Sequence, residues 1–340
     1  MNVEESVNKR IHNEISFMLD NARTNNNKDL WSSRAAQFLR KYVGDDNKVK
    51  YEVIENFRNN QVFINEFPSH NRSILDYVLG GRRGQQRYLK ERYKVMDNEG
   101  DLEWLEKYPI LDIGNPYTVS INGYIFNKRW SNNLRYLSLI NKHLDKKLCS
   151  NSFVTMDIGG GYGIFLYLLK NEYPKMKHIL VEFPEQLILS FYFLINCFPD
   201  ANINTLEEVY AAKVIDRTFI NKYDFCLVPI DCFSKINDNS IDLLANFFSL
   251  GEMSEEWFGK YRNSSLFNST KYFFTVNRFF SKPTYGTDID ILNYKLDDYK
   301  KLYFGVSPYE QYYYDSKWIF FEKKIPYTSQ FFEFIGKKII

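Results

Sequence analysis

Four glycines and one acid form the most informative cluster of residues in the chain. They lie in the segment VTMDIGGGYGIFLYLL, in which Asp157 precedes a G-x-G-x-G pattern made by Gly159, Gly161 and Gly163. Glycines at a turn from strand to helix let a ligand approach the backbone, whose amides can point at it. The dinucleotide fingerprint needs a further glycine at position 164, which is Ile164. The segment therefore predicts a ligand-binding loop and disfavours a nicotinamide dehydrogenase.

The charge of Asp157 narrows the choice of ligand. A carboxylate so close to the loop would repel a pyrophosphate group. S-adenosylmethionine (SAM) carries an ammonium and a sulfonium group and no phosphate, so a neighbouring carboxylate suits it. We therefore expect SAM as the cofactor, bound by Asp157 and the three spaced glycines.

Two further acids follow the next expected strands. Glu182 ends the second strand, where a carboxylate can accept hydrogen bonds from both ribose hydroxyls of a nucleoside. Asp231 follows the third strand, in PIDCF, and is placed to accept a hydrogen bond from the adenine amino group. Taken singly, Glu182 is also consistent with a surface acid and Asp231 with a helix N-cap. Because ligands of doubly wound sheets bind at the carboxyl ends of strands, we expect all these residues to form one cofactor site.

Alternating strands and helices must position these residues. Apolar runs predict strands at 153–158, 178–183, 225–230, 241–248 and 271–277, with helices at 164–170, 184–198 and 254–267. This alternation predicts a mostly parallel, Rossmann-like α/β sheet. Two later strand-like runs, 317–322 and 330–335, predict an antiparallel hairpin on the edge of the sheet.

The amino-terminal part has a different pattern of apolar and polar residues. An amphipathic pattern predicts a helix over 1–22, packed on the chain's own core, with a homodimer contact as the alternative. Asn122-Gly123 predicts a β-hairpin near 117–128, and a helix is expected over 132–144. The polar stretch 145–152 divides the chain into two expected domains. We expect residues 1–150 to be a mainly helical cap, substrate or dimerisation domain, and residues 151–340 to be the SAM-binding domain.

Composition excludes several classes of protein. The 340 residues carry 44 basic and 42 acidic side chains, so the net charge of +2 argues against a dedicated nucleic-acid binder. No apolar run approaches the roughly 18 residues of a membrane-spanning helix. The polar amino-terminal stretch has no apolar signal region. The four cysteines lack C-x2-C metal spacing, which favours reduced thiols in a cytoplasmic protein.

Several segments together resemble a known family. DIGGGYG, ILVEFPEQL, LVPIDCF and NFFSLGEM resemble the motifs of class I SAM-dependent methyltransferases. More narrowly, the Pro-Glu after Glu182, the Ser-x-x-Glu-Met at 249–253, Asn277-Arg278 and the Asn-Phe-Arg at 56–58 resemble the sugar O-methyltransferases of bacterial surface-polysaccharide and antibiotic-sugar gene clusters.

The resemblance covers about residues 50 to 335. It implies a class I methyltransferase sheet and O-methylation of a sugar hydroxyl, on a nucleotide-sugar or a glycan precursor, and in part it is an analogy of fold. Two alternatives stay open: another small-molecule acceptor, and a non-catalytic interaction protein with the same fold.

Methyl transfer to a sugar hydroxyl also needs a group that removes a proton. Alignment of the reactants can supply most of the rate, but a hydroxyl is a poor nucleophile without a general base or a metal. Glu252 follows the fourth strand, where the methyl group would be delivered, and is our candidate catalytic residue. Asp288 and Asp290 could join it around a divalent cation, although we assign no metal. The alternative for Glu252 is an acid at the amino-terminal end of the helix that Ser254 caps.

Overall fold

A computed structural model describes most of the chain. The description covers residues 3–20, 40–43, 48–59, 83–144, 153–318, 321–326 and 329–339.

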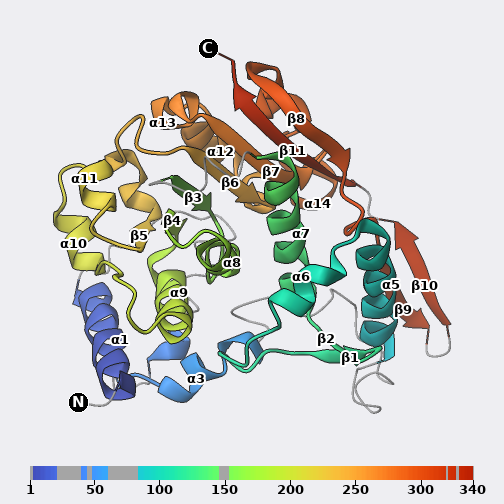
Figure 1. Ribbon diagram of the computed structural model, residues 1–340, viewed down its shortest axis with the longest axis horizontal. Coiled ribbons are helices and arrows are strands. Elements are labelled where there is room, and N and C mark those ends of the chain that lie inside the picture. Colours follow the sequence, from blue (N-terminus) through green and yellow to red (C-terminus); the bar gives the residue numbers. More distant parts are fainter. Residues whose placement is uncertain are drawn as a thin grey trace.

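The predicted strands form the centre of one large sheet (Figure 1). The parallel strands span Val154–Ile158 (β3), Lys177–Glu182 (β4), Phe225–Pro229 (β5), Leu243–Phe247 (β6) and Tyr272–Arg278 (β7). Two antiparallel strands, Tyr299–Val306 (β8) and Phe331–Lys338 (β11), complete it. In the described part of the chain this sheet has seven strands, in the order β5-β4-β3-β6-β7-β11-β8. The expected Rossmann-like sheet with an antiparallel edge is therefore confirmed.

The strand order reverses beside β3. The chain leaves β3 toward β4 and β5 on one side, then returns to β6 and β7 on the other. Ligands of open α/β sheets bind at such a reversal, outside the carboxyl ends of the strands. The glycine segment after β3 lies at this reversal.

The antiparallel edge differs from our expectation. β11 pairs with β7 and β8, and the run 317–322 is not its partner. That run belongs to a separate hairpin of Tyr312–Trp318 (β9) and Phe321–Pro326 (β10). The sequence analysis missed β8, whose two lysines and one glycine interrupt an apolar pattern.

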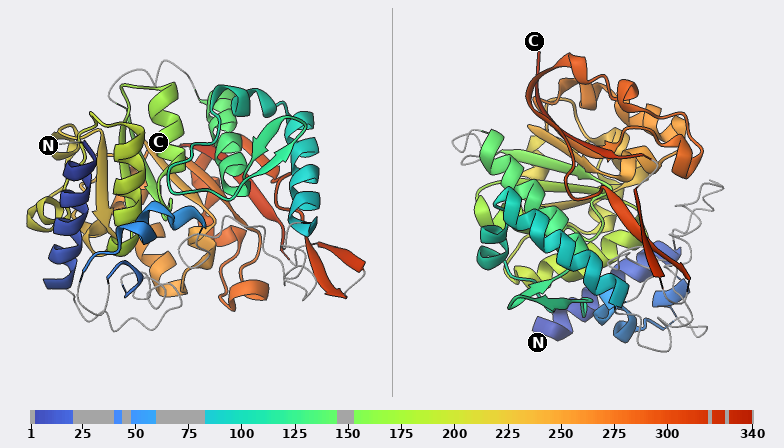
Figure 2. Two further views of the ribbon diagram at one scale, coloured as in Figure 1. Left: turned by 90° about the horizontal axis from the view of Figure 1, so that it is seen from below. Right: turned by 90° about the vertical axis from the view of Figure 1, so that its right-hand side faces the viewer.

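Helices cover both faces of the sheet (Figure 2). One face packs on Ile164–Glu172 (α8), Pro184–Cys197 (α9) and Lys128–His143 (α7). The other face packs on Glu255–Arg262 (α12) and Ser265–Ser269 (α13), with Arg217–Ile220 (α11) beside them. The single helix expected over 254–267 is therefore two, because Ser264 caps a new helix after α12. Shorter helices are Leu206–Ala211 (α10) and Lys282–Tyr285 (α14).

The described residues of the amino-terminal part form helices and one hairpin. Its elements are Val3–Asp20 (α1), Tyr51–Glu55 (α3), Arg83–Glu99 (α5), Leu102–Lys107 (α6), Val119–Ile121 (β1) and Tyr124–Phe126 (β2). Asn122 and Gly123 both have positive φ, at 50° and 85°, as a type I′ turn requires. The predicted hairpin is confirmed.

Helix α1 packs on the protein's own core. Ile11 and Ile15 are almost fully buried, and α1 contacts α9 and α10. The same core contains residues from α7 and from the sheet. The proposed boundary at 145–152 lies outside the described residues, so the division into two domains stays a prediction.

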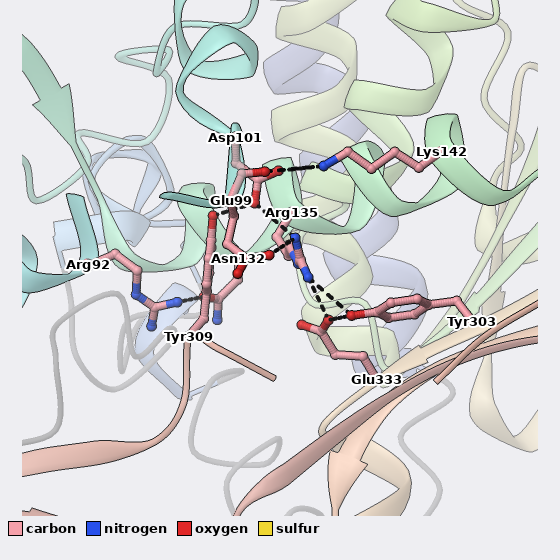
Figure 3. Close-up of polar contacts among 9 residues, drawn as sticks. All are labelled: Arg92, Glu99, Asp101, Asn132, Arg135, Lys142, Tyr303, Tyr309 and Glu333. Carbon is pink, nitrogen blue, oxygen red and sulfur yellow. Dashed lines mark hydrogen bonds and ion pairs between the residues drawn. The ribbon is translucent and has the colours of Figure 1, made fainter. Parts of the chain in front are cut away.

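A buried ionic cluster joins the amino-terminal helices to the sheet edge (Figure 3). Arg135 of α7 lies between Glu333 of β11, at 3.1 Å, and Asp101 before α6, at 3.4 Å. Asp101 also accepts a 2.7 Å hydrogen bond from the Tyr309 hydroxyl. All four side chains are nearly inaccessible to solvent. We call these four residues the Arg135 cluster; it ties α7 to the sheet on which the predicted site lies.

Candidate cofactor and acceptor site

The glycine loop joins β3 to α8 with a backbone that only glycine adopts readily. Gly159, Gly161 and Gly163 have φ values of 70°, 64° and 91°. Gly163 is also the residue that caps α8. The three glycines that the spacing singled out are therefore the three that need left-handed backbone.

Space as well as backbone angle limits this loop. A Cβ on Gly159 would lie 2.2 Å from the Ser249 hydroxyl, and one on Gly160 would lie 2.1 Å from a carboxylate oxygen of Asp157. Gly160 lies outside the G-x-G-x-G spacing and has no positive φ. The loop fits closely between the end of β3 and the turn after β6.

Asp157 lies beneath the loop without a partner of its own. Its side chain is 1% exposed, and neither carboxylate oxygen has a hydrogen-bond partner among the described residues. Burial raises the pKa of Asp157 well above its usual range, and the charge of Glu182 adds to the rise. A buried carboxylate in this state would gain from a cationic ligand at the loop.

Glu182 ends β4 beside the same loop. Burial raises the pKa of Glu182 to about 8, although N–H groups of Phe183 and Gly161 donate to its carboxylate and the charge of Arg129 favours ionisation. One of its oxygens would lie 3.7 Å from a Cβ on Gly159. Glu182 thus faces the glycine loop, where the sequence placed it.

Asp231 lies at the end of the next strand, on an exposed turn. It accepts hydrogen bonds of 3.0 and 3.2 Å from the Tyr210 hydroxyl. It belongs to the 3-10 helix Ile230–Lys235 (η3), whose capping residue is Pro229, so Asp231 is not an N-cap. Its charge acts on Glu185, at the start of α9. The structure places Asp231 at the same edge of the sheet as Glu182.

A buried amide network holds the turn that carries Glu252. Asn246 of β6 donates to the carbonyl oxygen of Ile158 at 2.7 Å, so it connects this turn to the glycine loop. Asn277 of β7 donates to Asn246 at 2.8 Å and accepts from the Gly251 N–H at 2.9 Å. Together these contacts fix the 3-10 turn Ser249–Glu252 (η4) against three strand ends.

Glu252 lies in a polar cluster formed by the ends of β6 and β7. Its carboxylate accepts a hydrogen bond from Tyr285, to which Arg278 also donates. Burial, together with the charge of Glu252, raises the pKa of Tyr285. Tyr285 therefore stays protonated and serves as a hydrogen-bond donor. The helix after this turn is capped by Ser254, as predicted.

Aromatic rings border this cluster. The rings of Phe248 and Phe331 meet edge to face, with centroids 4.9 Å apart, and the Arg278 guanidinium lies 4.4 Å from the centre of Phe331. Phe248 holds a positive φ of 68°, which a bulky residue rarely adopts. The region beyond the glycine loop thus combines charged groups with aromatic rings.

The acids considered for a metal do not gather around Glu252. Asp288 pairs with Lys282 at 2.6 Å, and Asp290 caps a short helix through the N–H of Leu292. Within the described residues, no group of three or more His, Cys, Asp or Glu side chains is placed to hold a metal ion. Both aspartates therefore have local structural roles.

Sequence reasoning missed three residues of the site. Arg129 comes from α7, far from the glycine loop in sequence, and a Cβ on Gly161 would lie 2.9 Å from its Nη1. Tyr285 sits in a segment without a diagnostic pattern. Asn246 begins the NFFSLGEM segment of the family resemblance, but no role was predicted for it. Asn277 was part of the family resemblance, and its contacts with Asn246 now give it a physical role.

Comparisons with known proteins give low similarity throughout. No protein-family model and no curated protein matches the chain. Similar solved structures include the precorrin-6Y C5,15-methyltransferase of Geobacter metallireducens, with 11% identity, coverage of 60% of this chain and 89% of that one, and a TM-score of 0.36. The mitomycin 7-O-methyltransferase MmcR has 11% identity, coverage of 62% and 57%, and a TM-score of 0.33.

The phosphoethanolamine N-methyltransferase 2 of Haemonchus contortus, in complex with SAM, has 10% identity, coverage of 61% and 45%, and a TM-score of 0.34. With TM-scores this low, these likenesses assign no activity. The fold rests on the strand order described above. Among the described helices, none is long and apolar enough to cross a membrane.

Proposed function

We propose that this protein is a SAM-dependent O-methyltransferase that acts on a sugar hydroxyl. The assignment of the cofactor rests on the buried carboxylate of Asp157, which has no hydrogen-bond partner among the described residues and lies under a glycine loop, with Glu182 ending the next strand. These groups fit SAM, because Asp157 suits its ammonium group and Glu182 its ribose hydroxyls. Asp231 continues the same edge and suits the adenine amino group.

SAM, when bound, supplies an electrophilic methyl group on a sulfonium. The protein must then hold the acceptor hydroxyl in line with that methyl group and take its proton. Glu252 is our candidate base, since its turn follows β6 and Ser249 of the same turn lies against Gly159. Tyr285 and Arg278 keep its carboxylate oriented.

A sugar acceptor is supported by the sequence resemblance and by the side chains at this end of the sheet. Sugars present many hydroxyls on a flat, partly apolar ring. Glu252, Tyr285 and Arg278 supply hydrogen-bonding groups, and the half-buried ring of Phe248 supplies apolar surface. A nucleotide-sugar or a glycan precursor is the substrate class that fits these features.

Calorimetry with SAM tests the cofactor. We expect the wild type to bind SAM and not NADH, and Glu182→Ala to weaken SAM binding at least about tenfold, because a charge-assisted contact is lost. Glu256→Ala, on the exposed face of α12, is the matched control and should bind normally. Tight NADH binding, or an unchanged affinity in Glu182→Ala, would overturn this cofactor site.

Transfer of a labelled methyl group tests the acceptor. Wild-type protein is incubated with methyl-labelled SAM and either nucleotide-sugars or small phenols. Product on a nucleotide-sugar, sensitive to Glu252→Gln, supports the proposal. Product on phenols alone would assign a different acceptor, and SAM binding without transfer to any acceptor of either class would favour a non-catalytic role.

A further inference from the structure

We propose that Arg129 binds the carboxylate of SAM, so that a helix of the amino-terminal part completes the cofactor site. This inference rests on the proposed use of SAM. Arg129 is in the first turn of α7, and its Nη1 lies where a side chain on Gly161 would begin. Its guanidinium therefore lies directly against the glycine loop.

The guanidinium of Arg129 has no anionic partner in the described residues. Its neighbours on α7 do have partners: Lys128 pairs with Glu310 at 3.4 Å, and Arg135 pairs with Glu333. For Arg129 the structure records no carboxylate within ion-pair distance; Glu182 is near enough only to feel its charge. An unpaired arginine beside a ligand-binding loop is a ready site for an anion.

The two charged groups at the loop match the two charges of an amino acid. Asp157 lies against Gly160, and Arg129 lies against the next residue, Gly161. The methionine portion of SAM carries an ammonium and a carboxylate on one carbon. Asp157 suits the ammonium, and the planar fork of a guanidinium suits a carboxylate in a bidentate contact.

The base of Arg129 is held firmly. Asn127 caps α7 by accepting the N–H of Trp130 at 2.9 Å, and the Trp130 indole donates to the Tyr108 carbonyl oxygen at 2.9 Å. Trp130 is fully buried, with the Arg58 guanidinium over its ring. Since the backbone on either side of Arg129 is fixed, its Cα has a defined position beside the loop.

A comparison of two cofactors and two variants tests this contact. Decarboxylated SAM lacks only the carboxylate, so the wild type should bind it at least about tenfold more weakly than SAM. Arg129→Met should bind SAM as weakly as the wild type binds decarboxylated SAM. The effects of changing the residue and of removing the carboxylate should not add, because both changes remove the same interaction. Arg129→Lys keeps the positive charge without the planar guanidinium, so its affinity for SAM should lie between those of the wild type and Arg129→Met. Lys94→Met, an exposed charge on α5, is the control and should bind both cofactors normally.

The outcomes separate this inference from the proposed function. If the wild type does not bind SAM, the function itself fails. If it binds SAM but Arg129→Met retains the preference for SAM over decarboxylated SAM, only the role of Arg129 fails. Equal loss of both cofactors in Arg129→Met would mean that the residue supports the loop rather than the carboxylate. Unchanged cofactor affinity with a higher KM for a nucleotide-sugar would place the acceptor's phosphate on Arg129 and overturn the inference.

Discussion

The side-chain amide of Asn277 donates to the amide oxygen of Asn246 at 2.8 Å and so joins the carboxyl ends of β7 and β6. Asn277 also accepts from the N–H of Gly251, directly before Glu252. Asn246 in turn reaches the carbonyl oxygen at the end of β3. Two buried amides thus connect the candidate base to the strand that carries the glycine loop.

Asn277→Ala should damage both stability and catalysis. The Gly251 N–H would lose its acceptor in a buried site, which costs about 1–3 kcal/mol of unfolding free energy. We expect turnover to fall because Glu252 is no longer fixed, while SAM affinity changes by less than about twofold. Urea unfolding and steady-state kinetics measure these effects. Asn196→Ala, on the exposed face of α9, is the control, and equal behaviour of the two variants would exclude the positioning role.

Gly161→Ala should weaken SAM binding at least about tenfold, because the new methyl group and the displaced Arg129 would occupy ligand space. Backbone strain at positive φ contributes as well. Gly100→Ala separates the two causes, since Gly100 has a φ of 72° and open space around its Cβ position. Calorimetry and thermal unfolding of both variants are the measurements. Normal SAM affinity in Gly161→Ala would show that the loop is only a structural turn.

The raised pKa of Glu182 predicts a pH-dependent stability in the absence of cofactor. The pKa of Glu182 is about 8 in the folded protein and has its ordinary value in the unfolded chain. At a pH between these two pKa values, Glu182 is protonated in the folded protein and ionised in the unfolded chain. The contribution of Glu182 to the unfolding free energy therefore falls as pH rises toward 8.

Glu182→Gln should remove this fall. The difference in unfolding free energy between Glu182→Gln and wild type should be at least about 1 kcal/mol more favourable to the variant at about pH 8.5 than at about pH 5.5. One pKa unit corresponds to about 1.4 kcal/mol. Urea unfolding at the two pH values without SAM measures the difference. A difference that does not change with pH would mean that Glu182 is ionised throughout.

Glu252→Gln should leave SAM affinity nearly unchanged and lower turnover by about 10²- to 10⁴-fold if Glu252 is the general base. Tyr285→Phe should lower turnover less, since it removes only a hydrogen bond to that carboxylate. A chelator added to the wild type separates base from metal: loss of activity that a divalent cation restores would favour the metal. If Glu252→Gln keeps full turnover but has lower thermal stability, the role of Glu252 is structural and not catalytic.

The parallel sheet was predictable because each strand is a short apolar run beside a helix-forming segment. The glycine loop and Glu182 were predictable for the same reason, since the ends of such strands meet at one edge. Arg129 was not, because its contact with the loop depends on how α7 packs across the sheet. The edge strands were assigned to the wrong partner because β8 and β11 are separated by the β9–β10 hairpin.

The Arg135 cluster has a consequence for protein engineering. Asp101 comes from the amino-terminal part and Glu333 from the last strand, and both are fully buried against one guanidinium. Removing one partner of a buried ion pair costs about 3–5 kcal/mol, because the remaining charges are left uncompensated. A chimera that exchanges residues 1–150 for those of a relative must therefore keep this arginine and both acids matched. An exchange of residues 1–150 must therefore be matched to the acid on β11, because these buried ion pairs cross between the two parts of the chain.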